Sequence, residues 1–315
     1  MDDDTRVRTP RILIIAGSDS GGGAGIQADI KTVTALDGYA ATAITALTAQ
    51  NTQGVFGVFP IKADFVRKQI DLVLEDIGAD AVKTGMLYDE SIINALADGL
   101  EHYGKPLKLV VDPVMLAKGG APLIDPNAVA ALKRRIINLS TIITPNLLEA
   151  EKLAGMSIRT VDNMEHAAVS LLTLGCEAVL ITGGHLESQV LTDVLATSRG
   201  VQRFRSDRIP TKHTHGTGCT LASAIATSLA QGMQIEEAVE RARAYVRRAI
   251  ETAPNYGRGQ GPINHAHTVE FAMGLASAPP VAKTAKAAKP ARKRNKKPVR
   301  AVNPKRRAKA KRKRA

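Results

Sequence analysis

Two glycine-rich segments contain residues whose types and spacing suit the binding of an anion. The first is Gly17-Ser18-Asp19-Ser20-Gly21-Gly22-Gly23-Ala24-Gly25, which follows an apolar run and precedes a predicted helix from about Ile26. Glycines allow the main chain to come close to a ligand, so this loop is expected to present backbone N–H groups. The same residues also suit a tight strand-to-helix turn that binds nothing.

The first loop matches a nucleotide-binding pattern only in part. Gly23, Gly25 and Ala28 have the spacing of the relaxed dinucleotide fingerprint, but the acidic residue expected about 20 positions further on is absent. The chain has no Gly-Lys-Ser or Gly-Lys-Thr, which excludes a P-loop.

The second segment, 214–220, reads Thr-His-Gly-Thr-Gly-Cys-Thr and directly precedes a predicted helix. Gly216 and Gly218 permit close approach of a ligand, and the N–H groups and dipole of the first helical turn favour an anion there. The same position predicts a lowered pKa for Cys219, which would allow it to act as a thiolate base or to hold a substrate. A small buried apolar side chain behind a glycine cap is the alternative, and packing is the predicted role of Cys176.

Three further segments place polar groups directly after predicted strands. Asp112 follows one strand, Asn146 and Glu149 follow the next, and a Thr-Gly-Gly-His turn occupies 182–185. Asn146 and Glu149 have the spacing of a helix capping box. Because parallel strands end at one edge of a sheet, Asp112 and Glu149 are also candidates to hold Mg²⁺ through water.

Apolar runs alternate along the chain with segments of helical period. The predicted strands are 11–16, 40–47, 81–84, 107–111, 141–144 and 178–182, and the predicted helices include 64–77, 91–103, 126–139, 161–174, 217–231 and 235–252. Continuous apolar strands are typical of a parallel sheet covered by helices on both faces, so an α/β fold is expected. The stretches 189–197 and 201–205 predict an antiparallel hairpin at the edge of the sheet.

Charge divides the chain unevenly. The 43 Lys and Arg residues outnumber the 30 Asp and Glu residues and give a formal net charge of +13. Residues 276–315 contain 17 Lys and Arg, five Pro and no acidic residue, so residues 1–275 carry 26 basic and 30 acidic residues. We expect a flexible N-terminus at 1–10, one folded domain at 11–275 and a disordered basic tail at 276–315.

Cysteine content and hydropathy predict the compartment. Two cysteines cannot form a disulfide framework, and no apolar run approaches the roughly 18–20 residues that span a bilayer. The N-terminal Met-Asp-Asp-Asp has no features of a signal peptide. A cytoplasmic protein is therefore expected.

Several motifs together resemble one known family. They are AGSDSGGGAGIQADIKT, ITALTAQNTQGV, KTGMLY, VVDPVMLAKGG, ITPNLLEAEKLAG, ITGGH and THGTGCTLASAIA, in that order, within roughly residues 10–272. They are similar to the hydroxymethylpyrimidine/phosphomethylpyrimidine kinases of thiamin biosynthesis, in the ribokinase-like superfamily. The resemblance implies a three-layer α/β/α sandwich with a mostly parallel central sheet, ATP and Mg²⁺ as cofactors, and a homodimer.

The resemblance also implies a reaction and a set of site residues. The hydroxymethyl oxygen of 4-amino-5-hydroxymethyl-2-methylpyrimidine would be phosphorylated first, and the monophosphate would then become the diphosphate. The implied pyrimidine pocket consists of Gly17, Asp29, Gln50, Met86 and Val114. The implied catalytic anion site consists of Gly216, Gly218 and Cys219, the Mg²⁺ side of Asp112 and Glu149, and the nucleotide side of Asn146, Thr182 and Gly184. Relatives often have Lys where this chain has Thr182, and Lys212 is the expected substitute for its charge.

Two other functions remain open from the sequence. A pyridoxal or pyridoxine kinase would share the fold and use a cysteine at the position of Cys219. Alternatively, the basic tail at 276–315 would bind the phosphate backbone of nucleic acid by counterion release, without base reading because it lacks aromatic residues.

Overall fold

The computed structural model describes residues 8–116, 120, 122–125, 127–186 and 188–272. The expected basic tail at 276–315 and most of the expected flexible N-terminus lie outside these residues.

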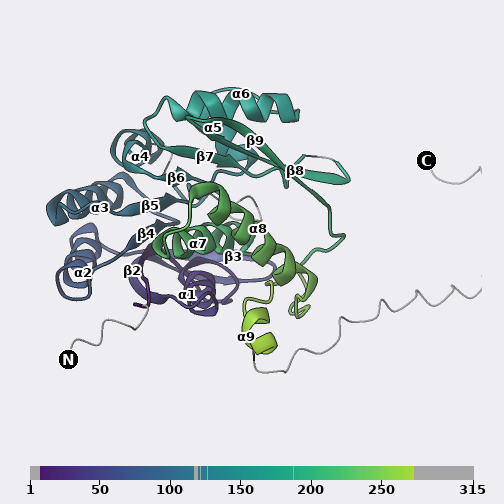
Figure 1. The fold of residues 1–315 in the computed structure, drawn as a ribbon. Coiled ribbons are helices and arrows are strands. Elements are labelled where there is room, and N and C mark those ends of the chain that lie inside the picture. The colour runs from purple at the N-terminus through teal and green to yellow at the C-terminus, as the bar shows by residue number, and fades with distance from the viewer. Residues whose placement is uncertain (1–7, 117–119, 121, 126, 187, 273–315) are drawn as a thin grey trace, which may run out of the picture. The chain divides into compact units, whose positions relative to one another are not determined.

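One mixed β-sheet forms the centre of the described part of the chain (Figure 1). Its strands are β1 (Arg11–Asp19), β2 (Tyr39–Asn51), β3 (Gly54–Pro60), β4 (Ala81–Thr84), β5 (Lys108–Val111), β6 (Ile142–Ile143), β7 (Ala178–Ile181), β8 (Val190–Thr197) and β9 (Gly200–Asp207). Their order across the sheet is β3-β2-β1-β4-β5-β6-β7-β8-β9. Strands β2, β1, β4, β5, β6 and β7 are parallel, whereas β3, β8 and β9 pair antiparallel.

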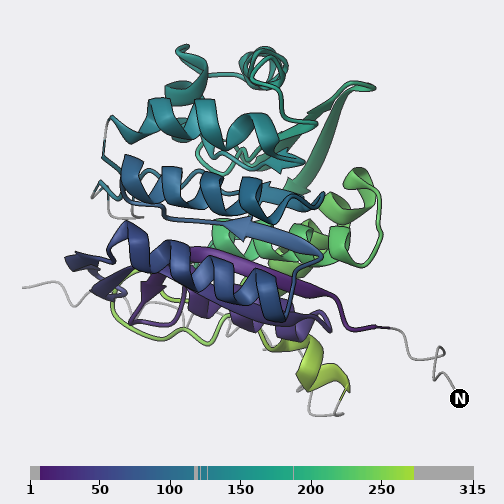
Figure 2. The ribbon, with the colours of Figure 1, turned by 90° about the vertical axis from the view of Figure 1, so that its left-hand side faces the viewer.

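Helices cover both faces of this sheet, as Figures 1 and 2 show. One face carries α1 (Gly25–Ala35), α7 (Thr217–Ala230) and α8 (Ile235–Glu251). The other carries α2 (Ala63–Asp76), α3 (Glu90–Tyr103), α4 (Ala128–Arg135), the 3₁₀ turn η1 (Ile137–Leu139), α5 (Leu147–Ala154) and α6 (Val161–Leu172). A short helix, α9 (His267–Ala272), ends the described chain. The predicted three-layer α/β/α fold with a mostly parallel sheet is confirmed.

The central strand β1 shows why a continuous apolar run predicts this architecture. Leu13 and Ile15 pack into the core formed with α2 to α6, whereas Ile12 and Ile14 pack into the core formed with α1, α7 and α8. All four side chains are fully buried. A strand with helices on both faces has no solvent face, so alternation of polar and apolar residues disappears.

The observed strands match the sequence prediction at one edge of the sheet and differ from it at the other. The predicted hairpin at 189–205 is confirmed as β8 and β9. At the opposite edge, β2 continues to Asn51 and β3 forms a second hairpin that was not predicted. Phe56 and Phe59 of β3 are 72% and 68% exposed, so this strand lacks the buried pattern that identified the others.

The parallel strands bring the candidate residues to one edge of the sheet. Asp19 ends β1, Asp112 follows β5, and Asn146 and Thr182, after β6 and β7, form a parallel β-bridge. Ligands of open α/β sheets bind at this carboxyl edge. Across the described residues, no helix is long and apolar enough to cross a membrane.

Candidate active site

The first turn of α7 forms one wall of the candidate site. Gly216 is the N-cap residue of this helix and has a φ of 84°. Because glycine has no side chain, it makes no capping hydrogen bond. A Cβ at Gly216 would lie 1.8 Å from the carbonyl oxygen of Gly23, so only glycine allows this contact. The start of α7 has no acidic residue, which leaves the positive end of the helix available to an anion.

Cys219 lies in this first turn, between the substrate-side loop and Asp112. Its side chain lies close enough to Lys83, Asp112 and Asp29 for their charges to act on the thiol. Burial raises the pKa of Cys219 to about 12, since the opposing charge of Lys83 is smaller in effect and the charges of Asp112 and Asp29 add to the rise. The predicted lowering of this pKa is wrong, because burial dominates at this position. The group present at neutral pH is a thiol.

Lys83, the buried residue of β4 that faces this turn, was not predicted as a site residue. Its Nζ lies 2.8 Å and 2.9 Å from the two carboxylate oxygens of Asp29 and 3.9 Å from Oδ2 of Asp112. Burial alone would lower the pKa of Lys83, but the charges of Asp29 and Asp112 raise it above its ordinary value. A lysine inside the apolar run 81–84 was the signal for such a buried charge.

Asp29 has no exposed surface in this arrangement. One of its oxygens also accepts a hydrogen bond from Ser223 of α7, at 2.7 Å. In the structure Asp29 is the buried partner of Lys83. Its direct contact with a pyrimidine, which the resemblance implies, stays a prediction.

Asp112 and Glu149 form the candidate metal side. Glu149 accepts hydrogen bonds from the N–H groups of Asn146 (2.9 Å) and Met115 (3.3 Å), and the predicted capping box with Asn146 is confirmed. Burial raises the pKa of Glu149 to about 8, with a contribution from the charge of Asp112, and burial raises the pKa of Asp112 to about 6. Both shifts arise mainly from burial, and the charge of Asp112 adds to the shift of Glu149.

The donor set at this point fits Mg²⁺ only with help from water and substrate. Oδ2 of Asp112 is buried without a hydrogen-bond partner in the described structure. No cluster of three or more His, Cys, Asp or Glu side chains suited to a metal occurs among the described residues. Mg²⁺ commonly binds one or two carboxylates together with phosphate and water, so the pair meets that requirement.

The implied pyrimidine residues, apart from Asp29, lie along the carboxyl edge of the sheet. Gly17 lies beside Met86, since a Cβ at Gly17 would come within 3.1 Å of the Met86 sulfur. The carbonyl of Met86 is fixed by the hydroxyl of Thr45 at 2.6 Å. Half-buried Val114 follows Asp112, and half-buried Gln50 exchanges main-chain hydrogen bonds of 2.9 Å with the hydroxyl of Ser20.

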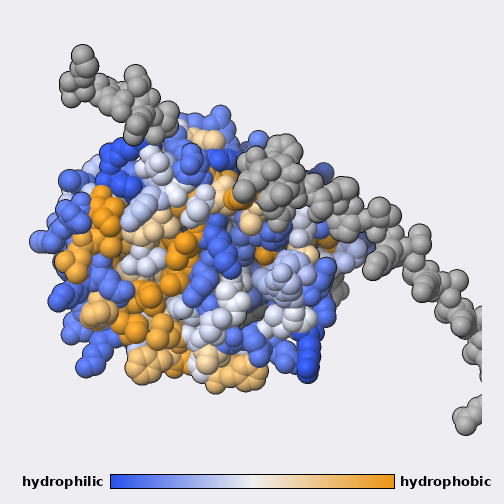
Figure 3. Space-filling view, turned by 90° about the horizontal axis from the view of Figure 1, so that it is seen from below, coloured by the Kyte–Doolittle hydropathy of each residue, from blue (hydrophilic) through white to orange (hydrophobic). Residues whose placement is uncertain are grey.

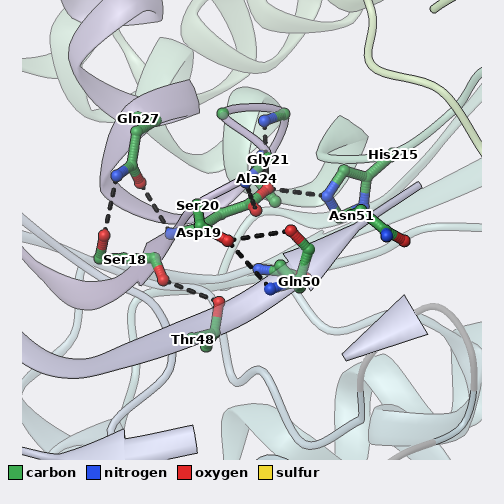
Figure 4. A network of polar contacts seen from close by, with 12 residues as sticks. Ser18, Asp19, Ser20, Gly21, Ala24, Gln27, Thr48, Gln50, Asn51 and His215 are labelled. Carbon is green, nitrogen blue, oxygen red and sulfur yellow. Dashed lines mark hydrogen bonds and ion pairs between the residues drawn. The ribbon is translucent and has the colours of Figure 1, made fainter. Parts of the chain in front are cut away.

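The glycine-rich loop at 17–25 does not present its N–H groups as expected. Those of Gly21, Gly23 and Ala24 donate to the carboxylate of Asp19 at 2.7, 3.0 and 2.8 Å (Figure 4). Burial alone would raise the pKa of Asp19, but hydrogen bonds from His215 and the loop hold it below its ordinary value. These three N–H groups are therefore already paired with Asp19, so they are not free to bind a phosphate.

A comparison with models of known protein families shows which family the chain belongs to. A model of the phosphomethylpyrimidine kinase family matches residues 19–264. The chain belongs to the phosphomethylpyrimidine kinase family.

Individual relatives agree with this assignment. The chain is 51% identical over 254 residues to the thiamine biosynthesis bifunctional protein ThiED of Geobacter sulfurreducens, covering 81% of this chain and 52% of that protein. It is 49% identical over 256 residues to the hydroxymethylpyrimidine/phosphomethylpyrimidine kinase of Bacillus subtilis, covering 81% of this chain and 94% of the relative.

Solved structures include members with two named activities. A Bacillus subtilis pyridoxal kinase bound to ADP has a TM-score of 0.77 and 37% identity, over 84% of this chain and all of that chain. A phosphomethylpyrimidine kinase of Clostridium difficile 630 has a TM-score of 0.68 and 42% identity, over 77% of this chain and all of that chain.

Of the residues predicted for the nucleotide side, Asn146 and Thr182 adjoin one another and Gly184 lines a shallow hollow. Thr182 donates its N–H to the carbonyl of Pro145 at 3.1 Å, which sets it beside Asn146. Gly184 is exposed, and its carbonyl accepts a hydrogen bond from Arg208 at 3.0 Å. The hollow has a volume of about 540 Å³ and is lined by Gly184, His185, Leu186, Ser188, Gln189 and Arg208. Lys212, the expected substitute for a lysine at Thr182, donates to the carbonyl of Arg258.

Proposed function

We propose that the protein phosphorylates the hydroxymethyl oxygen of 4-amino-5-hydroxymethyl-2-methylpyrimidine with ATP and then phosphorylates the monophosphate to the diphosphate. The observation that supports this proposal is that Cys219, in the first turn of α7, lies beside Asp112. The chain belongs to the phosphomethylpyrimidine kinase family. This arrangement offers an anion site and a proton path at one point.

The anion site would stabilise charge on the phosphoryl group during transfer. Gly216 and Gly218 allow close approach, and a Cβ at Gly218 would lie 3.9 Å from Oδ1 of Asp112. Backbone N–H groups fixed before the reaction are effective because they need no reorganisation as charge develops. We therefore assign Gly216, Gly218 and Cys219 to the catalytic set.

Cys219 would act as a proton relay rather than as a preformed thiolate. Its sulfur would receive the proton of the substrate hydroxyl while its own proton passes to the nearby Asp112 carboxylate. The charge of Lys83, whose Nζ lies 3.9 Å from Oδ2 of Asp112, favours the ionised carboxylate that this step requires. This route needs no free thiolate, in keeping with the raised pKa of the thiol.

Asp112 and Glu149 would hold Mg²⁺ together with water and phosphate oxygens. Oδ2 of Asp112, which has no hydrogen-bond partner in the described structure, and the effect of the Asp112 charge on Glu149 support this assignment. When bound, Mg²⁺ neutralises negative charge on the phosphates that take part in transfer. Asn146, Thr182 and Gly184 would contact the nucleotide beside this point.

The pyrimidine would bind between Met86 and the loop at 17–25. Met86 and Val114 offer apolar contact to the ring faces, and the amide of Gln50 can both donate to and accept from the aminopyrimidine edge. Gly17 leaves room for the ring beside the Met86 sulfur.

A time course with ATP and Mg²⁺ tests both steps. Mass spectrometry should detect the monophosphate first and the diphosphate later, with ADP formed in equal amount to the phosphoryl groups transferred. Accumulation of the monophosphate without any diphosphate would contradict the second step.

Pyridoxal is the second candidate substrate. The similarity to a pyridoxal kinase structure at 37% identity favours testing it. The higher identity to named hydroxymethylpyrimidine/phosphomethylpyrimidine kinases makes the pyrimidine the preferred substrate.

A homodimer is part of the proposal. Apolar side chains at the β2–β3 edge and on α2 are strongly exposed: Tyr39 (49%), Leu47 (45%), Phe56 (72%), Phe59 (68%) and Phe65 (57%). Figure 3 shows apolar side chains gathered on the face of the molecule seen from below. Leu47 and Phe59 are direct partners in the β2–β3 ladder, so their exposed side chains adjoin. Large exposed apolar areas mark interaction surfaces.

The tail at 276–315 suggests a polyanion contact in addition to the kinase reaction. Its 17 Lys and Arg residues without an acidic residue would bind duplex DNA with strong salt dependence. Truncation after Leu275 should abolish DNA binding and preserve kinase turnover. Salt-insensitive binding, or binding that survives truncation, would contradict this assignment.

The free thiols of Cys176 and Cys219 support a reducing compartment such as the cytoplasm for the reaction.

A further inference from the structure

The side chains of Asp19 and His215 join the two loops that meet at the proposed active site (Figure 4). Asp19 ends β1 and is 1% exposed, while His215 directly precedes the cap of α7. Nε2 of His215 lies 2.8 Å from Oδ2 of Asp19, and a carboxylate oxygen only accepts, so the ring N–H donates.

On its own side, Asp19 determines the shape of the glycine-rich loop. Oδ1 accepts the N–H of Gly21, and Oδ2 accepts those of Gly23 and Ala24 together with the imidazole. A change at Asp19 or in its partner would therefore alter the whole turn.

The loop in turn contacts the catalytic residues. The carbonyl of Gly23 lies against Gly216, and a Cβ at Gly23 would come within 2.6 Å of Cδ2 of His215. At the end of the loop, the backbone of Gly25 lies near the sulfur of Cys219. Displacement of the loop would thus move the groups that surround the thiol.

His215 is also fixed from its other side. Its backbone N–H donates to the carbonyl of Gly261 at 3.1 Å, and His215 forms a parallel β-bridge with Pro262. The segment 256–262 is tied in turn to the β2–β3 turn, because the N–H of Gln260 donates to the carbonyl of Thr52 at 2.8 Å. These backbone contacts fix the imidazole of His215 beside Asp19.

We propose that Asp19 and His215 are a positioning pair for phosphoryl transfer. Their hydrogen bond holds the wall of the pyrimidine site against the first turn of α7, so that the substrate hydroxyl faces Cys219 and the anion-binding N–H groups. This inference rests on the proposed function, and it assigns neither residue a contact with the reacting atoms.

Three variants test the pair: His215→Leu, His215→Gln and Asp19→Asn. His215→Leu removes the donor, and because a displacement of about 1 Å can cost about 100-fold in rate, kcat should fall by at least about 30-fold. The KM for ATP should stay within about threefold, since the nucleotide side is untouched. His215→Gln retains a side-chain N–H and should recover kcat to within about tenfold of wild type. Asp19→Asn keeps one oxygen and should resemble His215→Leu.

A matched control lies at the opposite end of the same strand. Arg11 and Asp80 form an ion pair at the amino end of β1, with an Nη2 to Oδ1 distance of 2.8 Å. Asp80→Asn should lower the unfolding midpoint and leave kcat unchanged, which separates loss of stability from loss of positioning.

Each outcome bears on a different claim. Turnover of His215→Leu within about threefold of wild type would overturn the positioning role, as would a His215→Gln variant as slow as His215→Leu. If His215→Leu does not fold, Asp19→Asn decides by the same kcat and KM criteria. A wild-type protein that transfers no phosphoryl group to the pyrimidine would instead contradict the proposed function.

Discussion

The ammonium group of Lys83 lies 2.8 Å and 2.9 Å from the two carboxylate oxygens of Asp29, and neither side chain is exposed. Ser223 of α7 donates a third hydrogen bond to this carboxylate. The pair therefore connects β4, α1 and α7 directly below the first turn of α7. Each charge depends on the other because neither is solvated.

Replacing Lys83 by Met should destabilise the protein and abolish turnover. Removal of one partner leaves a buried carboxylate without its cation, which typically costs about 3–5 kcal/mol in the free energy of unfolding. Urea unfolding would measure this loss. Asp80→Asn breaks the partly exposed pair with Arg11 and should cost about 1 kcal/mol or less. A Lys83→Met variant within about 1 kcal/mol of wild type would contradict the importance of the buried pair.

Cys219 should react slowly with alkylating agents at neutral pH. With its pKa raised to about 12, the thiol should react with iodoacetamide at least about 100-fold more slowly than an ordinary cysteine at pH 7.5. The Cys176→Ala variant isolates the signal of Cys219, and mass spectrometry follows the modification. The rate should still be rising with pH at pH 10. A plateau below pH 8 would show that the thiolate forms readily.

Glu149 should make the ligand-free protein less stable as the pH rises from 6.5 to 8. Its pKa is raised from an ordinary 4.5 to about 8, so the folded state binds a proton that the unfolded state releases. Stability therefore falls as pH increases, by about 1.5–2 kcal/mol over this window. His265, whose pKa burial lowers from 6.5 to about 4, is half protonated in the unfolded state at pH 6.5 and therefore contributes an opposing gain of only about 0.4 kcal/mol, which is the same in a Glu149 variant.

Urea unfolding of wild type and Glu149→Gln, without Mg²⁺, measures this dependence. The decrease between pH 6.5 and 8 should be absent or much smaller in the variant. Parallel curves for the two proteins would rule out Glu149 as the source.

Gly216→Ala should destroy the contact between the α7 turn and the glycine-rich loop. The new Cβ would lie 1.8 Å from the carbonyl of Gly23, and the φ of 84° is unfavourable for alanine. Loss of anion-binding geometry should reduce kcat by about 100-fold or more. Gly54→Ala is a suitable control, since a Cβ there meets nothing within 4 Å. Equal activity of the two variants would contradict the role of Gly216.

Substitution of Phe56 and Phe59 by Ser should convert a dimer to a monomer. The two side chains are the most exposed of the apolar residues at the β2–β3 edge. Light scattering coupled to size-exclusion chromatography would report the mass of both proteins. A wild-type monomer would contradict the proposed dimer.

The sequence predicts most elements of the fold because their signals are local. The apolar run at 11–16 and the capping box of Asn146 and Glu149 each depend on residues close together in the chain. Strand β3 was not predicted, because its exposed Phe56 and Phe59 do not follow the buried pattern.

The candidate site is predicted less completely because its electrostatics are not local. Helix position alone predicts a low pKa for Cys219, whereas burial of the thiol and the nearby carboxylates of Asp112 and Asp29 have the opposite effect. The partnership of Asp19 with His215 joins residues 196 positions apart, and that of Lys83 with Asp29 joins residues 54 apart. No single motif contains both members of either pair.

The ratio of kcat/KM for the pyrimidine alcohol to that for pyridoxal, measured with ATP and Mg²⁺, tests the central claim most directly. The account predicts turnover of the pyrimidine alcohol and of its monophosphate, with the alcohol preferred over pyridoxal by at least about tenfold. Turnover of pyridoxal without turnover of either pyrimidine would contradict it.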